Sequence, residues 1–139
     1  MDNILIIKDW NDHFENGASR KLVKMSWVPV PNKHDGTGYT RIMRTPDDKP
    51  RPDAAKIYSA WNLILQVASK CEPRGTLINK DGEPINSTEL SLKTRAPKDW
   101  FDIAIPILIE IGWISGESAD TSGESADTPA GKGREEKGR

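Results

Sequence analysis

The sequence has very few of the side chains that bind metals or act as nucleophiles. Its only cysteine is Cys71, and its only histidines are His13 and His34. No cluster has the spacing of a zinc site, and Cys71 has no partner for an internal disulfide. No base is evidently paired with a nucleophile either. We therefore expect a protein that is not an enzyme and that uses neither a metal nor another cofactor.

Long apolar segments are also missing. The apolar run at residues 4–7 has only four residues and lies between Asp2 and Lys8. It is far too short for the core of a signal peptide or for a membrane span. We expect it to be a β-strand and expect no membrane partner. Cys71 lies in the apolar stripe of a predicted helix, and a lone buried thiol fits a cytoplasmic protein.

The carboxyl-terminal part lacks aromatic and large aliphatic residues altogether. Residues 115–121 are repeated without change as residues 122–128, and the remaining residues are small, polar or charged. Such a segment cannot bury a core. We expect a folded domain with an N-terminal extension at residues 1–114 and a disordered tail or linker at residues 115–139. Whether this tail is a natural end or replaces a second domain stays open.

The net charge is low but unevenly distributed. A formal charge of −1 argues against a surface that is basic throughout. Between residues 18 and 56, however, nine basic residues are accompanied by only four aspartates. The basic residues are Arg20, Lys21, Lys24, Lys33, Arg41, Arg44, Lys49, Arg51 and Lys56. This excess suggests one basic face.

The clearest predicted element is a helix over residues 53–71. Its polar side chains recur every three or four positions and leave a wide apolar stripe. The apolar residues predicted to point inward are Ile57, Trp61, Ile64, Leu65 and Ala68. We predict that this helix is the centre of the core.

A strand and a capped helix are predicted next. Residues 75–79 are a short apolar run that ends at a turn signal containing Gly82, as expected of a strand. Asn86 is a favourable N-cap, and Glu89 follows at the third position after it, which predicts a helix start.

A second helix is expected to follow after a sharp turn. Residues 93–97 interrupt the first helix, and Pro97 suits the first position of the next one, which should run to residue 111. Pro106 predicts a kink within one continuous helix. Residues 113–114 are expected to be extended.

The order of these elements is typical of a winged helix-turn-helix. In this fold a helix, a strand, two helices at a sharp turn and a returning strand follow one another. The returning strand is expected to pair with the first strand. We predict an α+β fold, a winged helix-turn-helix with short β-strands and a disordered C-terminal tail. Another small α+β domain is the alternative.

The first fifty residues are predicted to be less regular. Two short helical pieces are expected on either side of Asn16 and Gly17, and the prolines in residues 27–31 require extended backbone. The loop at residues 32–38 resembles a phosphate loop. No Gly-Lys-Ser or Gly-Lys-Thr ends it and no clear helix follows, so an exposed turn is favoured. Residues 39–43 are predicted to be a short strand.

Five tryptophans allow two interpretations. They are Trp10, Trp27, Trp61, Trp100 and Trp113. Aromatic rings stack on the bases of single-stranded nucleic acid. For Trp61 and Trp113, however, the apolar neighbours favour packing in the core.

Basic residues surround the predicted turn between the last two helices. Lys93, Arg95 and Lys98 lie where a helix-turn-helix presents its turn and second helix to a DNA duplex. We predict that they contact DNA phosphates. The wider set of predicted DNA-binding residues adds Arg20, Lys21, Lys24, Arg41 and Arg44.

The second of these helices is acidic beyond the turn. It carries Asp99, Asp102 and Glu110. A catalytic pair of carboxylates is one interpretation, but a solvated helix face is favoured. Because these charges repel phosphate, we expect contacts to the DNA backbone rather than strong recognition of bases.

Five segments carry a resemblance to small bacterial and prophage proteins: WVPVPNK (27–33), DGTGY (35–39), AWNLILQVA (60–68), RGTLI (74–78) and AIPILIEIGWI (104–114). The strand-helix-turn-helix half is similar to the amino-terminal winged-helix domain of phage replisome organisers and DnaD-type primosomal helicase-loader proteins. The resemblance covers about residues 10–114. In that family a linker leads to a second, helical domain that contacts DNA or helicase.

The resemblance implies a DNA-binding winged-helix module that acts in phage or prophage DNA replication initiation. It implies a location in the cytoplasm of a bacterial host cell and a replicative helicase or its loader as a protein partner. Homo-oligomer formation stays open. The alternative is a protein-docking or oligomerisation winged-helix domain without useful DNA affinity.

Overall fold

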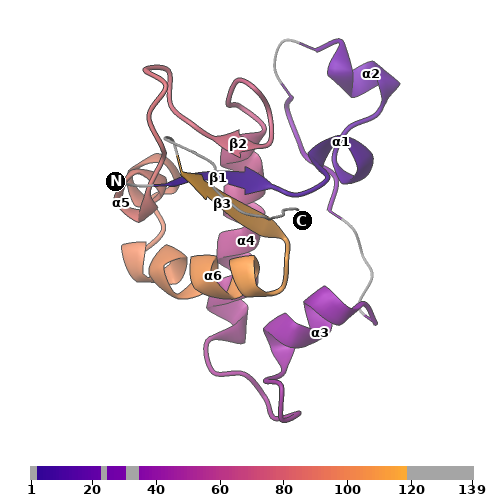
Figure 1. Cartoon of the computed structure of the whole chain (residues 1–139), viewed down its shortest axis with the longest axis vertical. Coiled ribbons are helices and arrows are strands. Elements are labelled where there is room, and N and C mark those ends of the chain that lie inside the picture. Colours follow the sequence, from indigo (N-terminus) through magenta and orange to yellow (C-terminus); the bar gives the residue numbers. More distant parts are fainter. Residues whose placement is uncertain (1–2, 23–24, 31–34, 119–139) are drawn as a thin grey trace.

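The computed structural model describes residues 3–22, 25–30 and 35–118. Within these residues the chain forms six helices and one three-stranded sheet (Figure 1). The strands are β1 (Asn3–Ile7), β2 (Thr76–Leu77) and β3 (Ile114–Ser118). The helices are α1 (Trp10–His13), α2 (Gly17–Arg20), α3 (Thr37–Met43), α4 (Ala54–Ala68), α5 (Ser87–Thr94) and α6 (Lys98–Glu110). The predicted α+β class is confirmed.

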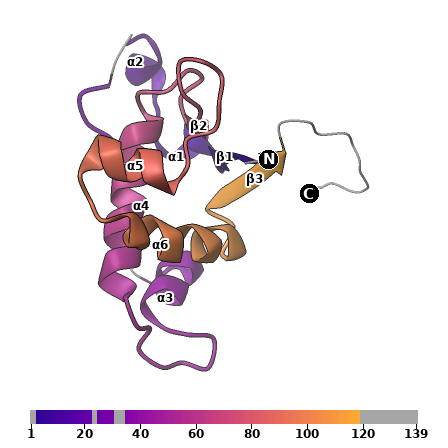
Figure 2. The same ribbon diagram turned by 90° about the vertical axis from the view of Figure 1, so that its left-hand side faces the viewer.

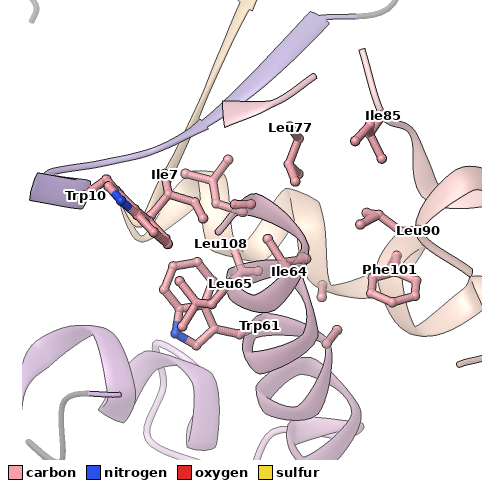
Figure 3. Packing of buried hydrophobic residues seen from close by; sticks show 14 of the residues in the cluster. Ile7, Trp10, Trp61, Ile64, Leu65, Leu77, Ile85, Leu90, Phe101 and Leu108 are labelled. Carbon is pink, nitrogen blue, oxygen red and sulfur yellow. The ribbon is translucent and has the colours of Figure 1, made fainter. Parts of the chain in front are cut away.

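Helices α4 and α6 form the core with one face of the sheet. Figure 2 shows both helices on the same side of the strands. The inward residues predicted for α4 are all buried, and Phe101 and Leu108 of α6 are fully buried as well. From the sheet, Ile7 and Leu77 add apolar side chains (Figure 3), and Ile114 is buried as well. The apolar stripe at helical spacing was therefore a reliable guide to the core.

The amino-terminal strand lies in the middle of the sheet. The strand order is β2-β1-β3, and β1 is antiparallel to both neighbours, with Leu5 opposite Leu77 and Ile7 opposite Ile114. The predicted pairing of the returning strand with residues 75–79 is therefore wrong. A run of apolar residues fits a central strand better than an edge strand, because both of its faces are partly covered.

Strand β3 continues past the domain boundary predicted at residue 114. Ser115 lies opposite Ile6 and Ser118 opposite Asn3, so residues 115–118 belong to the sheet rather than to a tail. They lack large apolar side chains, but pairing with β1 uses backbone N–H and C=O groups and does not require them. The rest of the predicted tail, residues 119–139, lies outside the described residues.

The two helices around the predicted turn are present. The side chain of Asn86 accepts a hydrogen bond of 3.0 Å from the Glu89 backbone N–H, as expected of an N-cap. Helix α5 ends at Thr94, and Pro97 is the N-cap of α6 rather than its first residue. Helix α6 is one continuous helix, and Pro106 lies inside it.

Residues 39–43 form a helix, and the prediction of a short strand there is wrong. The Thr40 backbone N–H and hydroxyl both donate to the carbonyl of Gly36, and the Arg44 N–H donates to the carbonyl of Thr40. Ile42 is completely buried. Helix α3 is thus stabilised by its packing against α4, which the weak local pattern of its seven residues did not indicate.

The two short helical pieces predicted near the amino terminus are confirmed as α1 and α2. A nearly buried ion pair attaches them to the rest of the domain: Arg74 Nη1 lies 2.8 Å from Glu15 Oε1. Arg74 also donates to the carbonyls of Ser19 and Leu22. Trp10 Nε1 donates to Glu15 Oε2 at 2.6 Å.

These contacts change the acidity of Glu15. Burial by itself raises its pKa, but the hydrogen bonds from Trp10 and Ser19 and the charge of Arg74 together bring the pKa below its usual value. The carboxylate is therefore held in its charged form where the outer helices join the core.

Candidate functional site

The turn between α5 and α6 is compact and internally hydrogen-bonded. Arg95 has left-handed backbone geometry, with φ of 67°. The Ser91 hydroxyl donates to the carbonyl of Ala96 at 2.7 Å, and the Ala96 N–H donates to the Thr94 hydroxyl at 3.3 Å. These bonds satisfy polar groups at the end of one helix and the start of the next. They hold the turn in one conformation.

The structure brings Lys93, Arg95 and Lys98 to this turn, and all three are exposed. Lys98 Nζ lies 2.7 Å from Asp102 Oδ2. Hydrogen bonds from Lys98 and Ser87 lower the pKa of Asp102. Within the described ranges, neither Lys93 nor Arg95 has an ion-pair partner. These two side chains are therefore the ones best placed to meet an external anion.

The acidic residues of α6 are partly compensated by nearby lysines. Asp99 Oδ2 lies 3.8 Å from Lys56 Nζ, which also lies 3.5 Å from Asp53. Asp102 pairs with Lys98. Glu110 is exposed at the far end of the helix. The turn is thus the basic end of a helix whose remaining exposed face is mixed or acidic.

The other predicted DNA-binding residues lie elsewhere. Arg20 and Lys21 are at the end of α2, whereas Arg41 and Arg44 are at the end of α3. Figure 1 shows α2, α3 and the α5–α6 turn in three separate parts of the molecule. Arg44 also pairs with Asp48 at 2.6 Å. The structure does not gather these residues and the turn into one basic face, and Lys24 lies outside the described residues.

An aromatic pocket that the sequence did not predict lies between α1, α3 and α4. It has a volume of about 250 Å³, and its walls include Phe14, Tyr39, Tyr58, Trp61 and Trp113. The ring centroids of Trp61 and Trp113 are 5.0 Å apart. Those of Tyr39 and Tyr58 are 5.6 Å apart, with their planes at 87°. Lys8, Asp9 and His13 add polar groups to the lining.

One wall of this pocket depends on a glycine. A Cβ added to Gly38 would lie 2.2 Å from Nε1 of Trp113, which is closer than any side chain tolerates. The absence of a side chain at residue 38 lets helix α3 approach the Trp113 ring. Residues 38, 61 and 113 are far apart in the sequence, so no local spacing indicated that they meet.

The five tryptophans have different environments. Trp10 and Trp61 are buried, and Trp100 and Trp113 are partly buried. Trp27 is 74% exposed. Core packing is therefore confirmed for Trp61, whereas Trp113 packs against the core and also lines the pocket.

The described residues offer no group of three or more metal-binding side chains. Cys71 is buried, and burial raises the pKa of its thiol, which makes it a poor nucleophile. None of the helices in the described ranges is both long enough and apolar enough to cross a membrane. Comparisons of this chain with protein-family models, curated proteins and solved structures found no match.

Proposed function

We propose that this protein is a DNA-binding winged-helix module that acts in phage or prophage DNA replication initiation. The observation that carries the proposal is the α5–α6 turn, where Lys93, Arg95 and Lys98 are exposed together at the start of a helix. Such a position allows a helix-turn-helix to contact phosphates on both sides of a groove.

The packing around the turn supports a winged-helix interpretation. Helix α6 packs against both α4 and α5, and the short strand β2 precedes α5 while β3 follows α6. The sheet differs from the usual pattern in one respect. Its central strand is β1, from the amino terminus. In the usual winged helix, the central strand is instead the second strand of the wing. The proposed wing is therefore formed by strands that are not consecutive in the chain.

The charges favour phosphate contacts over base recognition. Lys93 and Arg95 are without ion-pair partners in the described part of the chain, while the helix beyond them carries Asp99 and Asp102. Carboxylates in the major groove repel the backbone unless they accept from cytosine. The proposed binding is therefore strong at low salt and weakly dependent on DNA sequence.

Salt-dependent binding to a random DNA duplex tests the proposal. Each phosphate contact contributes a log-log slope of roughly −0.9. Replacing Lys93, Arg95 and Lys98 together with glutamine should therefore flatten the slope by about 2.7 units. A control replaces Lys70 and Lys80, which are exposed lysines away from the turn, and should leave the slope nearly unchanged. Equal slopes for the wild type and the triple variant would show that the turn does not contact DNA phosphates.

Protein docking is the second candidate function, and exposed Leu92 favours it. Leu92 is 75% exposed on α5, next to Lys93, and a partner that covers it removes its apolar surface from water. Under this proposal the wild type shows no salt-sensitive DNA binding. It forms a homo-oligomer or binds a replicative helicase or its loader instead. Sedimentation of the wild type and of Leu92→Gln separates this outcome from DNA binding.

A further inference from the structure

We propose that the aromatic pocket between α1, α3 and α4 binds the planar ring of a purine base. The pocket combines aromatic walls with polar groups that both donate and accept hydrogen bonds. This inference does not depend on DNA binding by the α5–α6 turn. It assigns a second site, on a different part of the molecule.

The size of the pocket selects the ligand class. An apolar cavity of about 150 Å³ is enough to hold benzene, and pockets for drug-sized ligands begin at about 300 Å³. The present pocket, at about 250 Å³, lies between these sizes. A two-ring heterocycle fits this range, whereas a large cofactor does not.

The partly exposed rings of the lining provide surfaces for stacking. They are Tyr39 of α3, Tyr58 of α4 and Trp113. Phe14 and Trp61 are buried behind them, and the ring centroids of Trp61 and Trp113 are 5.0 Å apart. Aromatic side chains of this kind stabilise a bound base through stacking.

The polar lining distinguishes a base from a simple cation. Lys8 offers a donor, Asp9 an acceptor and His13 one of each. A quaternary ammonium also binds to aromatic walls and is attracted by Asp9, but it is repelled by Lys8 and cannot accept a hydrogen bond from Lys8 or His13. A purine carries donors and acceptors along its edge, so it can use all three groups.

Asp9 is held in an unusual position at this pocket. Its φ is 55°, which is uncommon for a residue other than glycine. Its carbonyl accepts hydrogen bonds from the N–H groups of Asp12 and His13, at 3.0 and 3.1 Å. The start of α1 therefore fixes the backbone from which the Asp9 carboxylate extends, and no ion pair within the described ranges occupies that carboxylate.

The purine has two sources that share this chemistry. It is either a free nucleoside or nucleotide, or an unpaired base of a single-stranded nucleic acid. A base inside a duplex is excluded as a ligand, because its faces are stacked on its neighbours. In Figure 1, α1 and α3 lie on the opposite side of the molecule from the α5–α6 turn, so one short duplex bound at the turn does not cover the pocket.

Titration of the full chain with adenosine and guanosine tests the inference. Trp61 and Trp113 line the pocket, so binding should change the intrinsic tryptophan fluorescence, and calorimetry should give the same Kd. Uridine should bind more weakly, because it stacks less area. Oligo(dA) that binds more tightly than adenosine identifies a single strand as the source, and the reverse order identifies a free nucleoside or nucleotide.

Two variants and a matched control connect binding to the pocket. Tyr58→Ala should weaken adenosine binding roughly tenfold, in line with the loss of one stacking surface. Asp9→Asn keeps the shape and tolerates positive φ, and it should weaken binding about fivefold, because the neutral amide oxygen accepts a hydrogen bond more weakly than the charged carboxylate does. Asp12→Asn removes an exposed carboxylate from the same helix outside the pocket and should leave binding unchanged.

Three outcomes overturn the inference. The first is the absence of saturable binding of any purine probe at millimolar concentration. The second is purine binding that is unchanged in both Asp9→Asn and Tyr58→Ala, with both variants folded by circular dichroism. The third is binding of tetramethylammonium that is tighter than that of adenosine, which would assign the pocket to cations instead.

Discussion

The described chain has two regions that are stabilised in different ways. The core region, residues 54–114, contributes fourteen of the buried apolar side chains, and the outer segment, residues 8–52, contributes four. The outer segment is attached by individual contacts instead: the Arg74–Glu15 ion pair, the Phe14–Trp61 ring contact and the approach of Gly38 to Trp113. A few specific contacts therefore decide where it lies.

This difference matters for the two candidate sites. The α5–α6 turn belongs entirely to the core region, so its geometry follows from local hydrogen bonds and core packing. The aromatic pocket is formed where the two regions meet. Changes at the boundary should therefore affect the pocket while the turn keeps its geometry.

The largest expected effect comes from removing the ring that joins both regions. Trp61 is 4% exposed and contacts the rings of Phe14 and Trp113. Trp61→Ala should lower the free energy of unfolding by about 3–5 kcal/mol, measured by urea denaturation. Trp27→Ala is the control, because Trp27 is 74% exposed, and should change stability by less than about 0.5 kcal/mol. A stable Trp61→Ala variant that loses only nucleic-acid binding would favour the stacking interpretation.

Breaking the ion pair should release the outer segment more selectively. The side chain of Glu15 is 4% exposed, so Arg74→Met leaves a nearly buried charge without its partner. We expect a loss of about 3 kcal/mol and faster hydrogen exchange in α1 and α2 than in α4. Arg41→Met, at an exposed arginine on α3, is the control. Uniform acceleration of exchange across both regions would show that they unfold as one unit.

A single methyl group at the boundary should have a smaller effect. Gly38→Ala places a Cβ against the Trp113 ring, and such overpacking costs about 1–3 kcal/mol. Gly17→Ala is a close control, because nothing lies within 4 Å of the added Cβ, and it should be neutral or slightly stabilising. If α3 instead moves away from Trp113, the cost of Gly38→Ala should fall toward that of Gly17→Ala. Tryptophan fluorescence should then change only in Gly38→Ala, because the surroundings of Trp113 differ only in that variant.

The smallest expected effect is on acid stability. The pKa of Glu15 is lowered in the folded state, whereas an unfolded glutamate titrates near pH 4.3. The stabilising contribution is therefore present above about pH 4.3 and is lost as the pH falls through the lower folded pKa. Glu15→Gln should be less stable than the wild type at neutral pH, and the difference should shrink in acid. Glu110→Gln, at an exposed position, is the control, and the difference between its free energy of unfolding and that of the wild type should not change with pH.

The sequence predicted the position of some proposed DNA-binding residues better than that of others. Lys93, Arg95 and Lys98 meet at the turn as predicted, because their separation is short and the Asn86 cap and Pro97 define both helices. The wider basic set did not gather, because residues 20 and 41 belong to different helices. Whether any of these residues binds DNA stays a prediction.

The sequence by itself determined the elements whose signals are local. The apolar stripe of α4, the Asn86 cap and the strand at residues 4–7 are each defined by residues that are close together in the sequence. Local patterns work there because the same neighbours along the chain define both the backbone geometry and the buried face.

Only the tertiary structure decided which strand is central, that residues 37–43 are helical, and that residues 115–118 extend the sheet. The aromatic pocket also belongs to this group. Each of these features depends on partners that are distant in sequence, such as Gly38 and Trp113 or Ser115 and Ile6. Burial and backbone pairing between distant segments override weak local preferences, and a single sequence carries no direct record of such partners.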